Sequence, residues 1–516
     1  MKRVPSFAAL AAALVLAAGL VTVLSACGTG PARRSGFRPH APTAGGMAPA
    51  EKAAAEPAPA QPEEAGTEGE AREGGTEAER AERPSFFYFS YDDSASTASV
   101  QLAKDMVGRG HRPHPSLGRP WEFLSYEPFE PGTPETIGLF TVSMGLIRRD
   151  ADYRLGVYVS SPHLAPRQRR PAVLTLVVDV SGSMNEPAMG EASAEQSLRR
   201  LDLVKYGLEV LAARSLEAGD VVNIVTFSTE AKVLLEGARF PEQSNAIRRT
   251  IASLETERDT NLGAGIEAGY RAADAHFDPD KMNRVIMLTD AFANVGEIDP
   301  AIISEQTRRG DQEGIYFSGL GVGSGFNEAF LNVLTEAGKG AYFTLITRDD
   351  ARRAFEERLI ALLEVAARDV RFRLDFPPAL EREVTASEES SVRREDVQPT
   401  NFSYNTSQYF FEGFSAPNDA PSAAAEFRLT VEYSNPWTGE RREETITKTV
   451  AELLANHWEK QNIYQAEVIF LFTQLIAGEM SGGGVRAFLE RYHGNYTSPV
   501  IEEYEGLIDR LAELTG

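Results

Sequence analysis

Residues 173–183 read VLTLVVDVSGS, and the first six of them are apolar except for Thr175. A run this apolar is typical of a strand that is buried on both faces, as in the parallel sheet of an α/β protein. Asp179, Ser181 and Ser183 follow at the carboxyl end, spaced by two. We therefore predict a central strand that ends in a tight loop carrying oxygen-bearing side chains.

The surrounding segment alternates apolar runs with helical patterns. Leucines recur at helical spacing in residues 198–211, and a closing helix is expected at 351–363. Further buried strands are expected at residues 221–227, 284–288 and 314–320. Strands that alternate with helices are typical of a mostly parallel sheet covered by helices on both faces. We therefore predict a doubly wound α/β domain at residues 171–364.

The flanking regions follow another pattern. Apolar residues alternate with polar ones at 155–159, 370–376 and 427–433, which is the period of half-buried strands. The expected flanks are an N-terminal region with strands at residues 85–170, a β-rich region at 365–450 and a helical region at 451–516. With 516 residues, the chain is long enough for two or three domains.

Two later loops add oxygen-bearing side chains. Thr260 lies in the loop 259–263, and Asp290 follows a second apolar strand. Open α/β sheets generally build their binding sites at the carboxyl ends of the strands. Hydroxyl and carboxylate oxygens suit a hard cation such as Mg²⁺ or Mn²⁺. The sequence therefore predicts a site for one divalent cation at this edge of the sheet.

This pattern resembles the metal-ion-dependent adhesion site of the von Willebrand factor type A (VWA) family, in which Asp-x-Ser-x-Ser is followed by a Thr and an Asp. The resemblance covers residues 173–363 and implies a Rossmann-like fold. It implies five ligands that act directly or through water, namely the hydroxyls of Ser181, Ser183 and Thr260 and the carboxylates of Asp179 and Asp290. It also implies one open coordination position, which an acidic residue of a partner protein completes.

Two positions depart from the family pattern. Asp290 is followed by Ala291 and Phe292 where a glycine is frequent, and Asp259 precedes Thr260 where a glycine is common. The five ligands stay intact, but loop geometry and affinity are expected to change. The flanks resemble those of bacterial lipoproteins that carry a VWA domain. That resemblance implies that strands before and after the domain form a second, β-rich unit, with the metal loops at the far end.

The N-terminus has the pattern of an export signal, with Lys2 and Arg3 before an apolar segment at residues 7–24. Leu24-Ser25-Ala26-Cys27 resembles the lipobox of bacterial lipoproteins, which implies a signal peptide at residues 1–26 and lipid on Cys27. No other cysteine is present, so Cys27 cannot form an intramolecular disulfide. The alternatives are an uncleaved membrane anchor and a plain signal peptide, and both also export the protein.

Lipid on Cys27 would hold the protein to a membrane of the cell envelope. Gly28, instead of Asp, favours the outer membrane if the host is Gram-negative. Residues 27–84 are expected to form a disordered tether, because 41–83 contain no Val, Ile, Leu, Phe, Trp or Tyr. The net charge of −23 argues against a nucleic-acid partner, since phosphate binding needs clustered Lys and Arg.

Catalytic motifs are missing from the sequence, which has no Gly-x-Ser-x-Gly and no His-Glu-x-x-His. We therefore expect a non-enzymatic, lipid-anchored envelope protein whose VWA domain binds a partner protein through the cation. The alternative is a structural or assembly component of the envelope in which the metal only stabilises the fold. A hydrolase that uses the ion would need a general base beside it, and the sequence offers no distinctive one.

Overall fold

The computed structural model describes residues 84–91, 98–188, 198–291, 296, 299–324, 326–338, 340–492 and 496–515. Residues 84–516 group into one compact unit. The expected signal peptide, the lipidation site Cys27 and the tether up to residue 83 lie outside the described residues, as does Phe292 near the candidate site.

A six-stranded sheet forms the centre of the α/β domain, in the order β10-β9-β8-β5-β6-β7. Its strands are β5 (Ala172–Asp179), β6 (Val221–Phe227), β7 (Ala231–Arg239), β8 (Met282–Thr289), β9 (Ile315–Val322) and β10 (Tyr342–Leu345). Neighbouring strands are parallel except for β6 and β7, which are antiparallel. Every residue of β5 is buried, which explains why its sequence is so apolar. The doubly wound α/β fold is confirmed.

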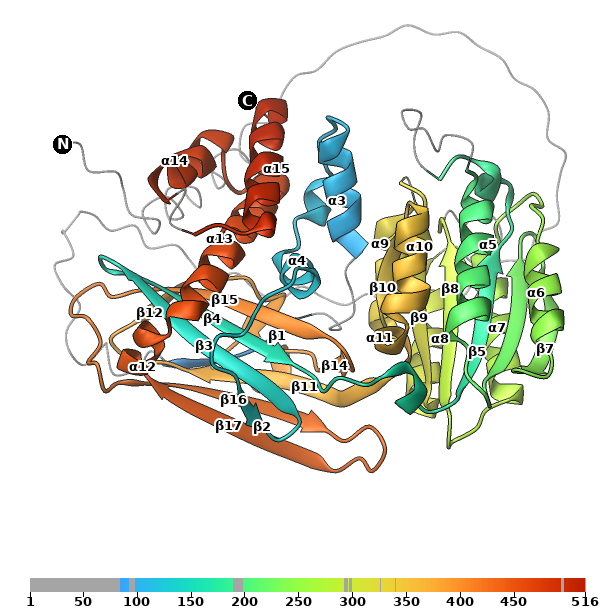
Figure 1. The fold of residues 1–516 in the computed structure, drawn as a ribbon, viewed down its shortest axis with the longest axis horizontal. Helices are drawn as coiled ribbons and strands as arrows, with labels where there is room; N and C mark the ends of the chain where they lie inside the picture. Colours follow the sequence, from blue (N-terminus) through green and yellow to red (C-terminus); the bar gives the residue numbers. More distant parts are fainter. Residues whose placement is uncertain are drawn as a thin grey trace, which may run out of the picture. The chain divides into compact units, whose positions relative to one another are not determined.

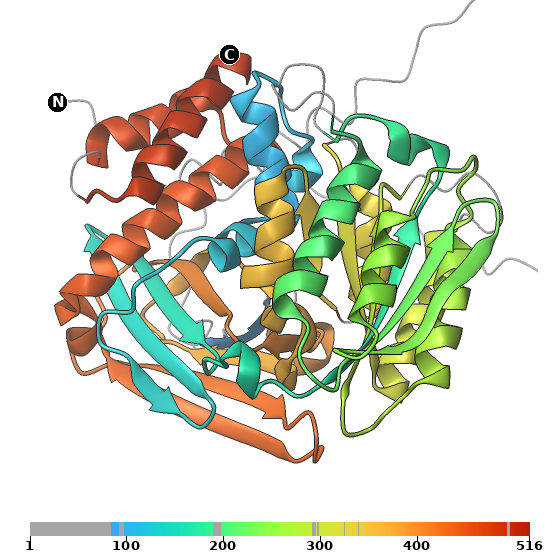
Figure 2. The ribbon, with the colours of Figure 1, turned by 45° about the vertical axis from the view of Figure 1, so that its right-hand side comes forward.

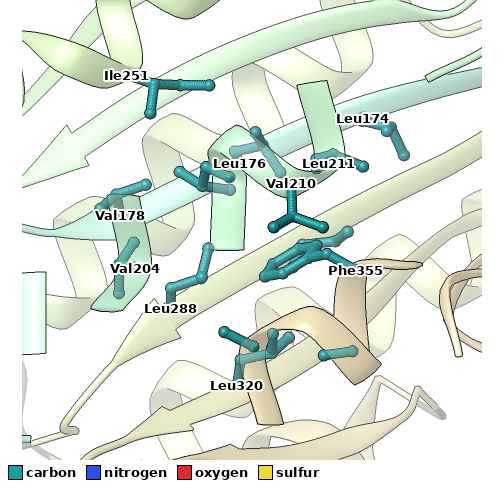
Figure 3. Close-up of a cluster of buried hydrophobic side chains, with 14 of the residues drawn as sticks. Leu174, Leu176, Val178, Val204, Val210, Leu211, Ile251, Leu288, Leu320 and Phe355 are labelled. Atoms are coloured by element: carbon teal, nitrogen blue, oxygen red, sulfur yellow. The ribbon is translucent and has the colours of Figure 1, made fainter. Parts of the chain in front are cut away.

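Helices cover both faces of this sheet (Figure 1). One face carries α5 (Arg200–Val210), α6 (Ser244–Ala252), α10 (Arg348–Arg352) and α11 (Leu359–Leu363), and the other carries α7 (Leu262–Ala275), α8 (Pro300–Glu313) and α9 (Glu328–Ala337). The turned view in Figure 2 shows the same two layers. Leu174, Leu176 and Val178 of β5 join the apolar cluster under α5, drawn in Figure 3. Burial contributes roughly 1.5–3 kcal/mol for each such side chain, so this cluster holds α5 against the sheet.

The helix predicted at residues 351–363 is interrupted. α10 ends at Arg352, a π-helical turn spans Arg353–Glu357, and α11 begins at Leu359. A second π-helical turn, Leu211–Ser215, continues α5. The predicted closing stretch is therefore helical, but it consists of two short α-helices joined by a π-helical turn. Apolar spacing did not reveal the break, because a π-turn inserts one residue into the helix while its apolar face stays on the core.

Two antiparallel sheets form the flanking β-rich region. One has the order β13-β1-β11-β16-β17 with β14 paired to β11, and the other has the order β12-β15-β4-β3-β2. Their strands are β1 (Phe86–Ser90), β2 (Glu135–Ile137), β3 (Phe140–Arg149), β4 (Asp152–Ser160), β11 (Val365–Asp375), β12 (Glu381–Thr385), β13 (Glu389–Ser391), β14 (Thr400–Ser403), β15 (Ser407–Ser415), β16 (Glu426–Ser434) and β17 (Arg441–Thr449). Phe410 packs against Phe89 and Phe372 of the other sheet, with ring centroids 4.9 and 4.6 Å apart. Aromatic rings therefore fill the space between the two sheets.

The α/β domain is inserted between strands of these sheets. β1 lies before it in the chain and pairs with β11, which lies after it, and β4 pairs with β15 in the same way. Both connections are at one end of the domain, since the backbone N–H of Arg170 donates to Oε1 of Glu364 at 3.0 Å. Arg284, near the start of β8, donates to the carbonyl of Leu363 at 2.9 Å. The carboxyl ends of β5 and β8 therefore point away from the connections.

The remaining α-helices of the described residues are α3 (Ala98–Gly108), α4 (Pro120–Tyr126), α12 (Val450–Ala455), α13 (His457–Ala477), α14 (Gly482–Tyr492) and α15 (Pro499–Thr515). α13 packs on β3, β4 and β15, where Phe470 and Phe411 have ring centroids 5.6 Å apart. The expected C-terminal helices are thus present. None of the described helices combines the length and apolarity needed to cross a membrane.

Candidate metal centre

Three loops meet at the carboxyl end of β5. β5 has β6 on one side and β8 on the other, so successive strands of the chain are added on opposite sides of it. Open α/β sheets generally bind their ligands at such a topological switch point. The loops that follow β5 and β8 begin here. The loop before α7 joins them, because the N–H of Gly182 donates to the carbonyl of Arg258 at 2.7 Å.

The loop after β5 holds Asp179, Ser181 and Ser183 in one turn. Oδ1 of Asp179 accepts a hydrogen bond from the N–H of Ser181 at 2.8 Å, and the hydroxyl oxygens of Ser181 and Ser183 are 3.1 Å apart. Asp179 and Ser181 are buried, whereas Ser183 is half-buried and Gly182 is exposed. The turn therefore presents its hydroxyl groups beside a buried carboxylate, with one side open to solvent.

The end of β8 brings a second carboxylate to the same place. The hydroxyl of Thr289 donates to Oδ2 of Asp179 at 2.6 Å and accepts from the N–H of Ala291 at 2.8 Å. Asp290 is fully buried, as Asp179 is. Burial, and next the negative charge of Asp290, raise the pKa of Asp179 to about 6. Two buried carboxylates thus repel each other at this site.

Thr260 reaches the site from the loop before α7. Its side chain is 2% exposed, and the residue after it, Asn261, caps α7 by accepting a hydrogen bond from the N–H of Ala264 at 3.1 Å. The N–H of Asn261 donates to the carbonyl of Ser228 at 2.7 Å, which ties the loop to the end of β6. All five predicted ligands therefore come from loops at one end of the sheet, while their use of a metal stays a prediction.

Arg200 is a functional candidate that sequence reasoning missed. One terminal nitrogen of its guanidinium donates to Oδ2 of Asp290 at 2.7 Å and to the carbonyl of Ser183 at 3.3 Å. Its side chain is only 8% exposed. The apolar spacing around it predicted a helix, but nothing in that spacing shows that the first residue of the helix points back into the site. An arginine beside the start of a helix is usually a surface residue.

The donor set fits a hard cation. The site combines buried carboxylates with neighbouring hydroxyl groups, the chemistry that Mg²⁺ and Mn²⁺ prefer. Among the described residues, no group of three or more His, Cys, Asp and Glu could hold a metal, so a zinc-type site is not found in that part of the chain. The arrangement places carboxylate and hydroxyl oxygens on its buried side and leaves Ser183 partly open to solvent.

The departures from the family pattern are visible in the backbone. Ala291 adopts a positive φ of 58°, a conformation that glycine adopts at little cost, and this is the position where the family often has glycine. Asp259 points outward, and the hydroxyl of Thr229 donates to it at 3.2 Å. Asp259 therefore lies at the exposed edge of the site, whereas Ala291 is buried beside Asp290, and neither displaces one of the five predicted ligands.

Comparisons with known proteins point to the same segment. Residues 174–293, which include all five predicted ligands, match the von Willebrand factor type A domain family. Uncharacterized protein YfbK of Escherichia coli (strain K12) is 30% identical over 207 residues, which is 40% of this chain and 34% of that protein. Inter-alpha-trypsin inhibitor heavy chain H3 of Homo sapiens is 30% identical over 168 residues, which is 31% of this chain and 17% of that protein. The chain thus spans about a third or less of these relatives.

Among solved structures, a von Willebrand factor type A protein from Catenulispora acidiphila has a TM-score of 0.43 and 15% identity, over 76% of this chain and 89% of that one.

Proposed function

Because this chain contains a von Willebrand factor type A domain, we propose that it is a non-enzymatic binding protein that holds a partner protein through one divalent cation, Mg²⁺ or Mn²⁺. The ligands of the ion, direct or through water, are Asp179, Ser181, Ser183, Thr260 and Asp290. An acidic side chain of the partner fills the open position.

The pair of buried carboxylates carries this proposal. Asp179 and Asp290 are both 0% exposed, at the ends of the adjacent strands β5 and β8. Buried charges of one sign are costly unless a counter-charge lies beside them. Arg200 pairs with Asp290 and balances one of the two charges, and a divalent cation next to the hydroxyl pair of Ser181 and Ser183 supplies the counter-charge for Asp179.

The open side of the site favours a macromolecular partner. Gly182 is exposed and Ser183 half-buried, so an incoming carboxylate can reach the hydroxyl pair. Two cavities in the described residues, of about 550 and 310 Å³, are lined by other residues. A site that opens at Gly182, outside these cavities, suits a protein surface better than a small molecule, which usually binds in a deep pocket.

The cell envelope is the proposed location. The charged start, the apolar segment at residues 7–24 and the lipobox-like residues up to Cys27 support an exported lipoprotein. Labelling with radioactive palmitate tests this directly. Incorporation that is lost in Cys27→Ser supports the anchor, and incorporation that is unchanged in this variant contradicts it.

Calorimetric titration of Mg²⁺ and Mn²⁺ into the full-length protein tests the function, with Asp179→Ala beside Asp259→Ala. Both variants remove one carboxylate from neighbouring loops, but Asp259 lies at the exposed edge. We expect saturable binding in the wild type and in Asp259→Ala, and a loss of at least about ten-fold in Asp179→Ala. Absence of binding in the wild type would sink the proposal.

Capture of partner proteins from an envelope extract, with and without chelator, separates the two functional readings. Capture that needs the ion and is lost in Asp179→Ala supports a cation-bridged contact. If the ion only raises the unfolding temperature and capture is unchanged in chelator, the protein is a structural or assembly component.

A further inference from the structure

We propose that Arg200 sets the specificity of the cation site, weakening the binding of the ion while making the ion-loaded site demand an acidic partner. This inference rests on the proposed function, and it concerns a residue outside the five ligands. It follows from the ion pair between Arg200 and Asp290 and from the burial of both groups.

Residues from several segments of the chain hold Arg200 in the site. Its backbone N–H donates to the carbonyl of Glu186 at 2.9 Å, and its guanidinium reaches Asp290 and the carbonyl of Ser183. Gly323, just after β9, leaves room for it, because a Cβ there would be 2.6 Å from Nε of Arg200. Three separate segments thus shape the space that this side chain fills.

Its neighbour shows what an ordinary arginine does at the same helix start. Arg199 is 45% exposed and pairs with Asp202 on the surface, at 2.7 Å. Exposed pairs of this kind contribute little to stability, since solvent screens them. Arg200, at 8% exposure, is by contrast paired with a carboxylate that is fully buried.

The first consequence concerns the affinity for the cation. Arg200 already supplies one positive charge to Asp290, so the site has a partial counter-charge before any ion arrives. A divalent cation must then bind next to a guanidinium, and in a poorly solvated site like charges repel strongly. Arg200 therefore lowers the affinity for the ion.

The second consequence concerns the partner. Two carboxylates and one guanidinium, all buried, leave a net charge of −1. A divalent cation changes this to +1, and one carboxylate from a partner brings it to zero. Without Arg200 the ion-loaded site would already be neutral. The nearby Glu186 is 63% exposed and lies outside this balance because solvent screens it. Arg200 thereby couples the ion to an acidic ligand.

The test compares full-length wild type with Arg200→Met and, as a matched control, Arg199→Met. Both variants lose one positive charge from adjacent positions. Calorimetry with Mg²⁺ and electron paramagnetic resonance of free Mn²⁺ measure ion binding. We expect at least about ten-fold tighter binding in Arg200→Met, and a change within about two-fold in Arg199→Met.

Acetate serves as the carboxylate probe for the second consequence. Water-proton relaxation of the Mn²⁺-loaded protein falls when a carboxylate displaces bound water. We expect acetate to lower it in the wild type at several-fold lower concentration than in Arg200→Met. Equal acetate sensitivity in both proteins overturns the coupling to an acidic ligand.

Arg200→Met could unfold because Asp290 loses its partner. In that case ion binding is compared between Asp290→Asn and the double variant Arg200→Met/Asp290→Asn. The double variant is then expected to bind the ion more tightly than Asp290→Asn. Equal or weaker ion binding without Arg200 overturns the inference and leaves the proposed function standing. Binding of Mg²⁺ or Mn²⁺ in Arg200→Met but not in the wild type supports the inference, and it contradicts the proposed function because the native protein would then work without the cation. No binding in any protein removes both.

Discussion

Replacing Glu412 by Gln should make the protein more stable above pH 7 and leave its stability unchanged near pH 4. Glu412 lies on β15, is 1% exposed, and accepts hydrogen bonds from the hydroxyls of Thr385 and Ser387 at 2.9 and 3.1 Å. Burial raises the pKa of Glu412 from 4.5 to about 7, against the opposing effect of Arg382. Since each pKa unit corresponds to about 1.4 kcal/mol, ionisation in the folded protein costs up to about 3 kcal/mol.

The sign follows from proton linkage. Between pH 4.5 and 7 the folded protein keeps a proton on Glu412 that the unfolded chain has lost, so stability falls as pH rises through this window and then levels off. Glutamine has no charge to bury, so this loss disappears in Glu412→Gln.

Urea unfolding at pH 4, 6 and 8 measures the effect, with Glu443→Gln, an exposed position on β17, as the control. The buried Asp179 also has a raised pKa, but it is present in all three proteins and cancels in the difference. We expect Glu412→Gln to gain up to about 3 kcal/mol over wild type at pH 8. A gain that is the same at all pH values, or a loss at pH 8, would refute the reasoning.

Three further changes test other parts of the structure. Thr289→Val should weaken Mg²⁺ binding about ten-fold in calorimetry, because Asp179 loses a hydroxyl donor that holds its carboxylate. Thr289→Ser keeps the hydroxyl and should bind Mg²⁺ as the wild type does. Equal binding in Thr289→Val and wild type would show that the hydroxyl is dispensable. Gly269→Ala should destabilise the fold by about 1–3 kcal/mol in urea unfolding, since its Cβ would lie 2.5 Å from a valine of β5. Gly506→Ala, at an exposed position of α15 with open space around it, should not, and equal effects of the two changes would contradict the close packing of α7. Phe410→Ala should lower the free energy of unfolding by about 3–5 kcal/mol in the same assay, because its ring packs between the two antiparallel sheets. A loss below about 1 kcal/mol would mean that the packing of the sheets does not depend on this ring.

The fold of the α/β domain could be predicted because its information is local. Buried parallel strands need continuous apolar runs, and residues 173–178 have one that ends in polar residues. The candidate ligands follow such strands directly, so chain order alone places Asp179 and Asp290 at one edge. Thr260 lacks this local signal and was reached through the family pattern.

Contacts between distant residues could not be predicted in the same way. Arg200 and Asp290 are 90 positions apart, and no spacing rule connects the start of a helix with the end of a strand so much later in the chain. Thr289 was hidden for a similar reason, since a Thr before an Asp has no pattern of its own. The role of residues 86–89 depends on pairing with β11, almost 290 positions later, which apolar alternation cannot specify.

The place where the α/β domain joins the two antiparallel sheets, which pack face to face as a β-sandwich, also bears on how such a protein could arise. The chain enters and leaves the domain at adjacent points, marked by the bond between Arg170 and Glu364, and the sandwich strands on either side pair with each other rather than with the insert. A gene segment coding for this domain could therefore be gained, lost or exchanged without breaking a strand pairing in either sandwich sheet. The β-sandwich and the α/β domain can thus evolve as separate modules, because the loops of the α/β domain can change while the sheets of the β-sandwich stay the same.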